Sequence, residues 1–319
     1  MHRTDAQAAP TRTPDWRIGL VGFAYPEWTG PFYPSELADH RRFAWYAARH
    51  NAVEINTTFY GPPSPGTVKA WARTAPADFR FALKAPRDIT HGPTPEGALA
   101  NAAGPGPGHF NRPETLVILR RVLDNASVLG DRLGPILMQF PPAFTDAART
   151  ELTGYLDRIE PHLSGLRASA PNARLAVEFR HASWATAQTA AMLADRGMTL
   201  VHADHSTRSD SPEAMRLTPP HPIAVTSDIL YLRFLGRHGQ FRDRTREQLD
   251  PTARLARWKD RTADALGSHP AVRTVYAFFD NDYAGHAPAT AARFAALVGA
   301  RQPVLAETKP LGSPTLFEL

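Results

Sequence analysis

Eight short apolar segments recur along the chain, and they constrain its fold more than any other feature. Most are followed by a segment with apolar residues at helical spacing. Strands alternating with helices over roughly 280 residues match the (β/α)8 TIM barrel in number and size. No G-x-G-x-x-G turn or P-loop supports the alternative, a doubly wound sheet. We therefore predict an α/β fold, a single (β/α)8 TIM barrel, with strands at Arg17–Phe23, Ala52–Asn56, Phe79–Lys84, Pro135–Gln139, Leu175–Glu178, Thr199–Asp204, Ile229–Phe234 and Thr274–Phe279.

The N-terminal segment differs from the rest of the chain. Residues 1–16 are polar and contain no apolar core of a secretory signal, so we predict a disordered leader there. The barrel domain is then expected over 17–319, with long loops at its C-terminal face. No run approaches the roughly 18 apolar residues that cross a membrane, which favours a cytoplasmic protein without a membrane partner. The absence of cysteine excludes disulfides and thiolate nucleophiles.

The charge balance is mildly basic, with a formal net charge of +5 and a pI of about 9.7. This balance is compatible with an anionic partner, either a small ligand or a nucleic acid, but does not require one. The chain has 36 basic residues, of which four are lysines, so a lysine at a special position is informative. These lysines are Lys69, Lys84, Lys259 and Lys309. No pattern in the sequence indicates an oligomeric state.

Polar side chains follow seven of the eight predicted strands. Side chains alternate between the two faces of a strand, and we assign the large apolar set to the face covered by helices. The other set ends in polar residues, and the C-terminal ends of barrel strands converge on one face. An alternative is that some of these residues form internal salt bridges in a polar barrel core. The predicted mouth contains Glu54, Asn56, Lys84, Gln139, Glu178, Arg180, His202, Asp204, Arg233 and Asp280.

Lys84, Arg180 and Arg233 supply the positive charge of this mouth. We expect them to hold a phosphate or carboxylate group, which arginine binds through two parallel hydrogen bonds. Glu54 and Glu178 are the expected acid and base, with pKa values set apart by the nearby cations. A second interpretation makes Lys84 a Schiff-base amine, which requires a depressed pKa. The predicted catalytic set is Glu54, Glu178, Asp204 and His286.

Residues in the loops extend the predicted site. Tyr25 and Trp28 are expected to stack on a sugar or a base, unless they plug the barrel instead. Asp282 and His286 are expected to form a charge-assisted pair, unless Asp282 caps the following turn. The predicted substrate-binding set is Tyr25, Trp28, Asn56, Tyr60, Lys84, His91, Gln139, Arg180, Arg233, Asn281 and Asp282.

A metal site is a further hypothesis. Carboxylates and imidazoles are ligands for divalent Mg, Mn or Zn. No H-E-x-x-H or similar spacing accompanies them, so the sequence does not select a metal. The candidate ligands are Glu54, Glu178, His202, Asp204, Asp282 and His286.

Six motifs carry a resemblance to a known family. They are Gly22-Phe-Ala-Tyr-Pro-Glu-Trp-Thr-Gly-Pro-Phe-Tyr-Pro34, Val53-Glu-Ile-Asn-Thr-Thr-Phe-Tyr60, Lys84 with Ile89-Thr-His91, Gly134-Pro-Ile-Leu-Met-Gln-Phe-Pro-Pro142, Val177-Glu-Phe-Arg-His-Ala-Ser-Trp184 and Phe279-Asp-Asn-Asp-Tyr-Ala-Gly-His-Ala-Pro288. Over about residues 17–298 the chain resembles the domain of unknown function 72 family, also called YecE-like. The resemblance implies a TIM barrel and no established activity.

Two positions depart from the pattern that this resemblance implies. Leu235 stands where a histidine is expected after the seventh strand, and Asp280 stands where an asparagine is expected. A reaction that needs a histidine at position 235 is therefore not expected in this chain.

Two classes of function follow from these observations. The first is an enzyme, a hydrolase or a lyase, that acts on a small polar anionic substrate with carboxylate acid–base chemistry. Retaining glycosidases carry carboxylates after strands four and seven, where this chain has Gln139 and Arg233, so that arrangement is not expected. The alternative is a nucleic-acid-binding protein or a metal-dependent repair endonuclease similar to endonuclease IV. The small number of histidines at the mouth opposes this alternative. Four arginines in the loops favour it, namely Arg237, Arg242, Arg244 and Arg246.

Overall fold

Eight parallel strands close into a barrel in the order of the sequence, from β1 next to β2 around to β8 next to β1. The structure is a computed structural model that describes residues 13–92, 104–205 and 222–300. The predicted (β/α)8 barrel is confirmed. The strands are β1 Asp15–Val21, β2 Ala52–Ile55, β3 Arg80–Lys84, β4 Leu133–Gln139, β5 Arg174–Glu178, β6 Thr199–His205, β7 Ile229–Leu235 and β8 Thr274–Phe279.

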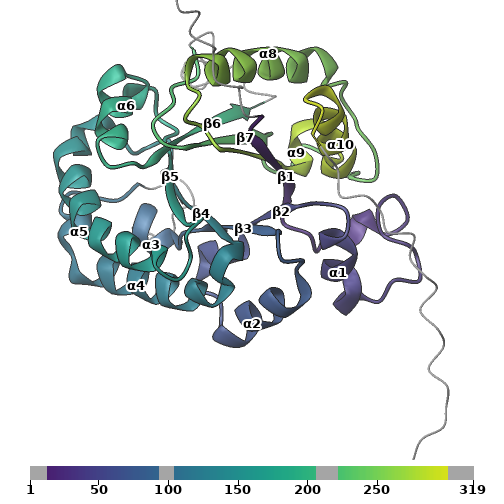
Figure 1. Cartoon of the computed structure of the whole chain (residues 1–319), viewed down its shortest axis with the longest axis horizontal. Helices are drawn as coiled ribbons and strands as arrows, with labels where there is room; N and C mark the ends of the chain where they lie inside the picture. Colours follow the sequence, from purple (N-terminus) through teal and green to yellow (C-terminus); the bar gives the residue numbers. More distant parts are fainter. Residues whose placement is uncertain (1–12, 93–103, 206–221, 301–319) are drawn as a thin grey trace, which may run out of the picture.

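The α-helices lie outside the barrel and cover the strands (Figure 1). They are α1 Arg42–Ala47, α2 Pro65–Thr74, α3 Arg87–Thr90, α4 Pro113–Ala126, α5 Arg149–Arg167, α6 Ala187–Ala194, α8 Thr252–Ser268, α9 Asn281–Ala284 and α10 Ala287–Leu297. Short 3-10 helices in the connections are η1 Pro26–Trp28, η2 Asp39–Arg41, η3 Thr57–Tyr60, η4 His109–Asn111, η5 Ser127–Arg132, η6 Asp146–Ala148 and η7 Ala182–Trp184.

The first strand begins inside the segment that the sequence assigns to the leader. Asp15 and Trp16 pair with Thr274 and Val275 of β8. The domain boundary expected at residue 17 therefore comes two residues too late, because residues 15 and 16 help to close the barrel. The first twelve residues of the predicted leader lie outside the described residues.

The barrel interior is filled by side chains of unequal size. Strands β2, β3 and β5 contribute Ala52, Ala82 and Ala176, and strands β7 and β8 contribute Tyr231 and Phe278. The two aromatic rings pack with their centroids 5.3 Å apart. Large rings from one side of the barrel thus occupy the space that alanines leave on the other, and a packed core lies beneath the mouth.

The close approach of α9 to β7 needs a glycine at Gly236. A Cβ atom built there would overlap the carbonyl oxygen of Asp282 in α9. Because only glycine lacks this atom, Gly236 lets the backbone of α9 pack directly against the end of β7. This contact places the β8–α10 connection beside the mouth.

Candidate active site

One arginine binds two glutamates at the centre of the barrel mouth. Arg233 donates from Nε to Oε2 of Glu54 at 2.9 Å and from Nη2 to Oε1 at 2.6 Å. Its Nη1 donates to Oε2 of Glu178. Tyr231 donates its hydroxyl to Oε2 of Glu54 at 2.7 Å. All four side chains are buried, so the charges compensate one another out of contact with water.

These contacts determine the protonation of Glu178. Burial alone would raise the pKa of this carboxyl group, but the positive charges of Arg233 and Arg180 outweigh burial and hold the pKa well below its usual range. Glu178 is therefore ionised at neutral pH and carries no proton to donate. Glu54 accepts three hydrogen bonds, which favours the internal salt bridge over the predicted acid–base role.

Lys84 is the mouth residue whose charge is least compensated. It is the last residue of β3, and its side chain is 9% exposed. No carboxylate in the described ranges lies within ion-pair distance of its Nζ, because Arg233 and Arg180 occupy the nearby glutamates. Burial, together with the charges of Arg233 and Arg180, lowers the pKa of Lys84 to about 7.

The connection after β2 positions this lysine. Nζ of Lys84 lies 4.0 Å from the centroid of the Phe59 ring, a cation–π contact. Thr58, the neighbour of Phe59 in η3, donates its hydroxyl to the backbone oxygen of Lys84 at 2.6 Å, and the same Oγ1 lies 3.0 Å from the backbone oxygen of Ile55. This threonine therefore ties the ends of β2 and β3 together and places the ring against the amine.

Asn56 lies at the same end of β2 and is half-buried. Its Oδ1 is buried, and among the described residues it has no hydrogen-bond partner. A buried acceptor of this kind is rarely left without a partner, so it suits a donor group of a ligand.

His91 is buried beside Phe59, with the two ring centroids 5.0 Å apart. Its Nδ1 is 2.8 Å from Oγ1 of Thr90. Burial first, and then the charges of Lys84, Arg180 and Arg87, lower the pKa of His91 to about 3. The imidazole is therefore neutral at physiological pH and can offer a hydrogen bond but no charge to a ligand.

Arg180 extends the cationic side of the mouth toward solvent. Its Nε donates to Oε1 of Glu178 at 2.8 Å, and 26% of its side chain is exposed. Gln139 of β4 pairs in register with Glu178 and is also buried. The hydrogen bond to Glu178 uses Nε, so the two Nη atoms of Arg180 are not engaged by that carboxylate and can bind an anion.

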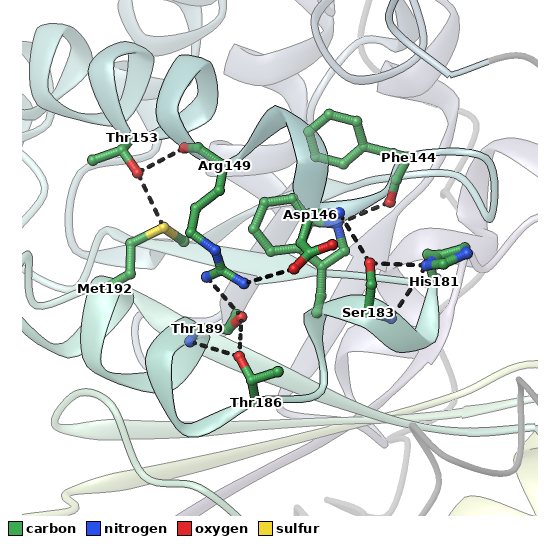
Figure 2. A network of polar contacts seen from close by, with 10 residues as sticks. Phe144, Asp146, Arg149, Thr153, His181, Ser183, Thr186, Thr189 and Met192 are labelled. Carbon is green, nitrogen blue, oxygen red and sulfur yellow. Dashed lines mark hydrogen bonds and ion pairs between the residues drawn. The ribbon is translucent and has the colours of Figure 1, made fainter.

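The loop that carries Arg180 is held by a polar network (Figure 2). Ser183 Oγ accepts from the backbone N–H of Asp146 at 2.9 Å and lies 2.9 Å from Nδ1 of His181. That same Nδ1 accepts from the backbone N–H of Ser183 at 3.1 Å, and Trp184 donates to the carbonyl oxygen of Phe144 at 2.8 Å. The His181–Ser183 pair thus caps η7 and joins the loops after β4 and β5, which fixes the backbone next to Arg180.

Asp280 and Tyr25 form the opposite side of the mouth. Asp280 follows β8 and accepts from the backbone N–H of Asp282 at 2.8 Å, so Asp280, and not Asp282, caps α9. Burial and the nearby charge of Asp282 raise the pKa of Asp280, despite that hydrogen bond. Burial and the charge of Asp280 likewise raise the pKa of Tyr25, whose hydroxyl donates to the Val21 carbonyl at 2.8 Å.

The predicted orientation of β6 is wrong. Asp204 pairs in register with Phe234, which packs against the helices, whereas His205 pairs with Leu235, which faces the barrel interior. His202 and Asp204 therefore point outward, and His202 is 2.9 Å from the carbonyl oxygen of Ala224. Asp204 cannot belong to the predicted catalytic set at the mouth.

Asp204 instead anchors α8 and α9 to the barrel. It accepts from Nε of Arg254 at 2.7 Å, from the indole N–H of Trp258 at 2.7 Å and from the hydroxyl of Tyr283 at 2.9 Å. All of these contacts reach a fully buried carboxylate. Its partners lie far along the chain, in two helices, so the role of Asp204 is to fix those helices.

This correction predicts the behaviour of an Asp204→Asn variant. The free energy of unfolding is expected to fall by roughly 2–4 kcal/mol, because Arg254 loses its anionic partner. Ligand binding at the mouth should not change. Denaturation in urea measures the first quantity, and Asp157→Asn, which removes a more exposed partner of Arg196, serves as the control. Lost ligand binding with unchanged stability would return Asp204 to the mouth.

Trp28 is fully buried, which agrees with a plug and contradicts a stacking platform. Its indole N–H donates to Oδ1 of Asn281 at 3.0 Å, and the same Oδ1 accepts from the backbone N–H of Ala287 at 3.2 Å. Asn281 therefore joins the loops after β1 and β8. Its Nδ2 is buried and has no hydrogen-bond partner among the described residues, so its contact with substrate stays a prediction.

Asp282 and His286 hold the connection between β7 and α8. Asp282 accepts from the backbone N–H of Gly239 at 2.9 Å and from Arg244 at 3.5 Å. His286 donates from Nδ1 to the carbonyl oxygen of Arg244 at 2.8 Å. The two residues bind the same loop separately and not each other, and burial lowers the pKa of His286. Anchoring this loop explains both residues better than the predicted catalytic and binding roles.

Two further positions from the sequence analysis, Tyr60 and Leu235, differ in where they lie. Tyr60 lies at the end of η3 with 79% of its surface exposed, so it forms no part of the buried mouth. Leu235 stands where a histidine is expected, but another histidine, His205 of β6, is the register partner of Leu235 and faces the same interior, near Glu178. The sequence pattern does not predict His205 and Phe59 as site residues, because His205 has the opposite parity to the assigned set and Phe59 lies in a loop.

Within the described ranges, no three His, Asp or Glu side chains are grouped as a metal site would need. The predicted ligand set is divided between the mouth, the outer face of β6 and the β8–α10 connection. In the same part of the chain, no helix has the length and apolar character to cross a membrane.

Comparisons with known proteins agree with this architecture. The chain is 27% identical to the UPF0759 protein YecE of Escherichia coli K12 over 266 residues, which are 79% of this chain and 85% of that protein. A crystal structure of a DUF72 family protein from Thermotoga maritima MSB8 has a TM-score of 0.62 at 27% identity and covers 89% of this chain and 99% of its own. One from Enterococcus faecalis V583 has a TM-score of 0.64 at 19% identity, covering 91% and 99%.

The fold of the chain is therefore shared with these solved structures. A family model described as "Protein of unknown function DUF72" matches residues 17–314, nearly the whole barrel and its loops. The chain belongs to the DUF72 family of TIM-barrel proteins.

Proposed function

We propose that the barrel mouth is the active site of an enzyme that binds a small polar molecule through a phosphate or carboxylate group. Three cations, Lys84, Arg180 and Arg233, face two glutamates there. Arg233 binds both glutamates, whereas Arg180 binds Glu178 through Nε and not through its Nη atoms. This partly exposed guanidinium beside a buried lysine is the observation that carries the proposal.

The groups that transfer protons differ from the expected pair of glutamates. A useful general acid or base has a pKa near the working pH. Lys84, with a pKa of about 7, suits the role of a base, and the raised pKa of Asp280 suits an acid. Glu178 is held ionised and favours a structural and electrostatic role.

The nucleic-acid alternative draws less support from the loop arginines. Arg244 lies 3.5 Å from Asp282, and Arg246 lies 3.7 Å from Asp243. Both charges are thus partly compensated within the loop, whereas phosphate contacts along a nucleic acid need a row of available cations. We therefore place the small-molecule enzyme first.

Binding of inorganic phosphate and of acetate, measured by calorimetry, tests the anion site. Arg180→Gln is expected to weaken anion binding about tenfold or more, because a charged hydrogen-bond donor contributes roughly 1.5–3 kcal/mol. Arg196→Gln removes an arginine that pairs with the more exposed Asp157 and is the matched control.

Equal affinities in the wild type and Arg180→Gln would contradict the proposal. Tight binding of duplex DNA with a steep dependence on salt, together with no anion binding at the mouth, would favour the nucleic-acid alternative.

A further inference from the structure

We propose that Lys84 is a nucleophile that forms a Schiff base with a carbonyl compound bearing an anionic group. The inference rests on the proposed anion site and names its class of substrate: a small aldehyde or ketone whose carboxylate or phosphate binds Arg180. Amine catalysis of this kind needs a lysine that is accessible to the ligand and free of strong anionic partners.

The geometry around Lys84 meets the second of these needs, and its position at the end of β3 with 9% exposure bears on the first. The residue ends β3 at the mouth, and its Nζ packs on an aromatic ring at 4.0 Å instead of on a carboxylate. Two glutamates are near enough to affect Lys84 electrostatically, but both bind arginines. Glu54 binds Arg233, and Glu178 binds Arg233 and Arg180. Arginine is always charged and binds carboxylates in a bidentate manner, so it outcompetes the lysine for them.

The other lysines of the chain lack this environment. Lys69 is exposed on α2, and Lys259 lies 3.7 Å from Asp260 with 44% of its side chain exposed. Lys309 lies outside the described residues. Arginine supplies most of the positive charge of the chain, and one of its four lysines lies at the buried end of a barrel strand.

The reaction balances without a further reactant. The Lys84 ammonium gives up a proton, the free amine attacks the carbonyl carbon, and a carbinolamine forms. Its C–O bond then breaks, the hydroxyl leaves as water with the proton released earlier, and a C=N⁺ iminium remains. The positive charge stays at the nitrogen, where the charges of Glu178 and Glu54 already act on Lys84.

Reductive trapping tests the inference on the wild-type protein. Glyoxylate is added with cyanoborohydride, which reduces an iminium to a stable amine, and labelled peptides are quantified by mass spectrometry. Near neutral pH we expect Lys84 to be labelled at least about tenfold faster than Lys69 and Lys259, since ordinary lysines are almost fully protonated there. The rate at Lys84 should level off above a pH of about 7.

A neutral probe of equal length separates this inference from the anion site. Glycolaldehyde carries a hydroxymethyl group where glyoxylate carries a carboxylate. Faster labelling of Lys84 by glyoxylate, reduced to the glycolaldehyde rate in Arg180→Gln, is the expected result for both proposals. Selective labelling of Lys84 at equal rates by both probes would support the nucleophile and overturn the anion site. Labelling of Lys84 no faster than Lys69 by either probe would overturn the Schiff-base inference, and phosphate binding would then decide the anion site alone.

Discussion

Replacing Arg233 by methionine is expected to lower the free energy of unfolding by roughly 3–5 kcal/mol at neutral pH. The variant leaves Glu54 and Glu178 buried without the guanidinium that binds both of them. A buried carboxylate without a partner must either stay ionised at high energy or take up a proton. Urea denaturation at pH 7 measures the loss.

The pH dependence of this loss identifies its cause. In the wild type the pKa of Glu178 lies below its unfolded value, so its contribution to stability is present above that value and is lost as the pH falls through the folded pKa. Without Arg233, the effect of burial on Glu178 should outweigh that of the remaining positive charges, and the pKa of Glu178 in the folded state should rise above its value in the unfolded chain. The destabilisation of Arg233→Met should then be smaller at pH 5 than at pH 7.

A compensated variant controls for lost packing. Adding Glu54→Gln and Glu178→Gln to Arg233→Met removes the charges that the arginine balances, and most of the stability should return. If Arg233→Met unfolds at the wild-type urea concentration, or if the triple variant is as unstable as the single one, the ion network does not stabilise the barrel as described.

The sequence predicts the barrel and most of its inward face because strand periodicity is local. In β2 and β5, large apolar side chains alternate with small or charged ones, and this contrast assigns Glu54 and Glu178 to the interior correctly. Arg233 of β7 also faces the interior, although the inward side of that strand includes the large ring of Tyr231. The parallel pairing of neighbouring strands then brings the ends of these strands to one mouth.

Strand β6 shows where the same reasoning fails. Leu200 and Val201 are similar in size, so the pattern of Thr199–His205 gives no clear contrast between the two faces, and strand parity assigns the set that ends in Asp204 to the mouth. The charge is instead satisfied outside the barrel by Arg254, Trp258 and Tyr283. Partners at least fifty residues away cannot be inferred from the spacing within a strand.

The site chemistry is likewise a property of three-dimensional contacts. The sequence places Lys84, Arg180 and Arg233 together, but it does not say which arginine binds which glutamate. Only the contacts show that Arg233 is shared by both carboxylates and that Lys84 packs on Phe59. The predicted condition for a Schiff-base amine, a depressed pKa, follows from those contacts.

The same environment predicts that Lys84 destabilises the folded protein below neutral pH. Its folded pKa of about 7 lies below the usual 10.5 of an unfolded chain, so the unfolded state binds one more proton between these values. Stability should therefore rise with pH through this window by up to about 1.4 kcal/mol per pH unit from this one residue. Below the folded pKa the ammonium is buried in the folded state, and the full energetic penalty is present.

Lys84→Met removes this dependence while keeping an unbranched side chain at the mouth. Relative to the wild type, the variant is expected to gain a few kcal/mol of unfolding free energy near pH 6, and the gain should shrink as the pH approaches 10. Urea denaturation of both proteins across this range measures the difference, with Lys69→Met as the exposed control. Parallel curves for wild type and Lys84→Met would mean that Lys84 titrates as an ordinary lysine. If the two stability curves converge as the pH rises, the folded protein lowers the pKa of Lys84 and favours its neutral amine. A neutral amine is expected of a nucleophile and not of a structural cation.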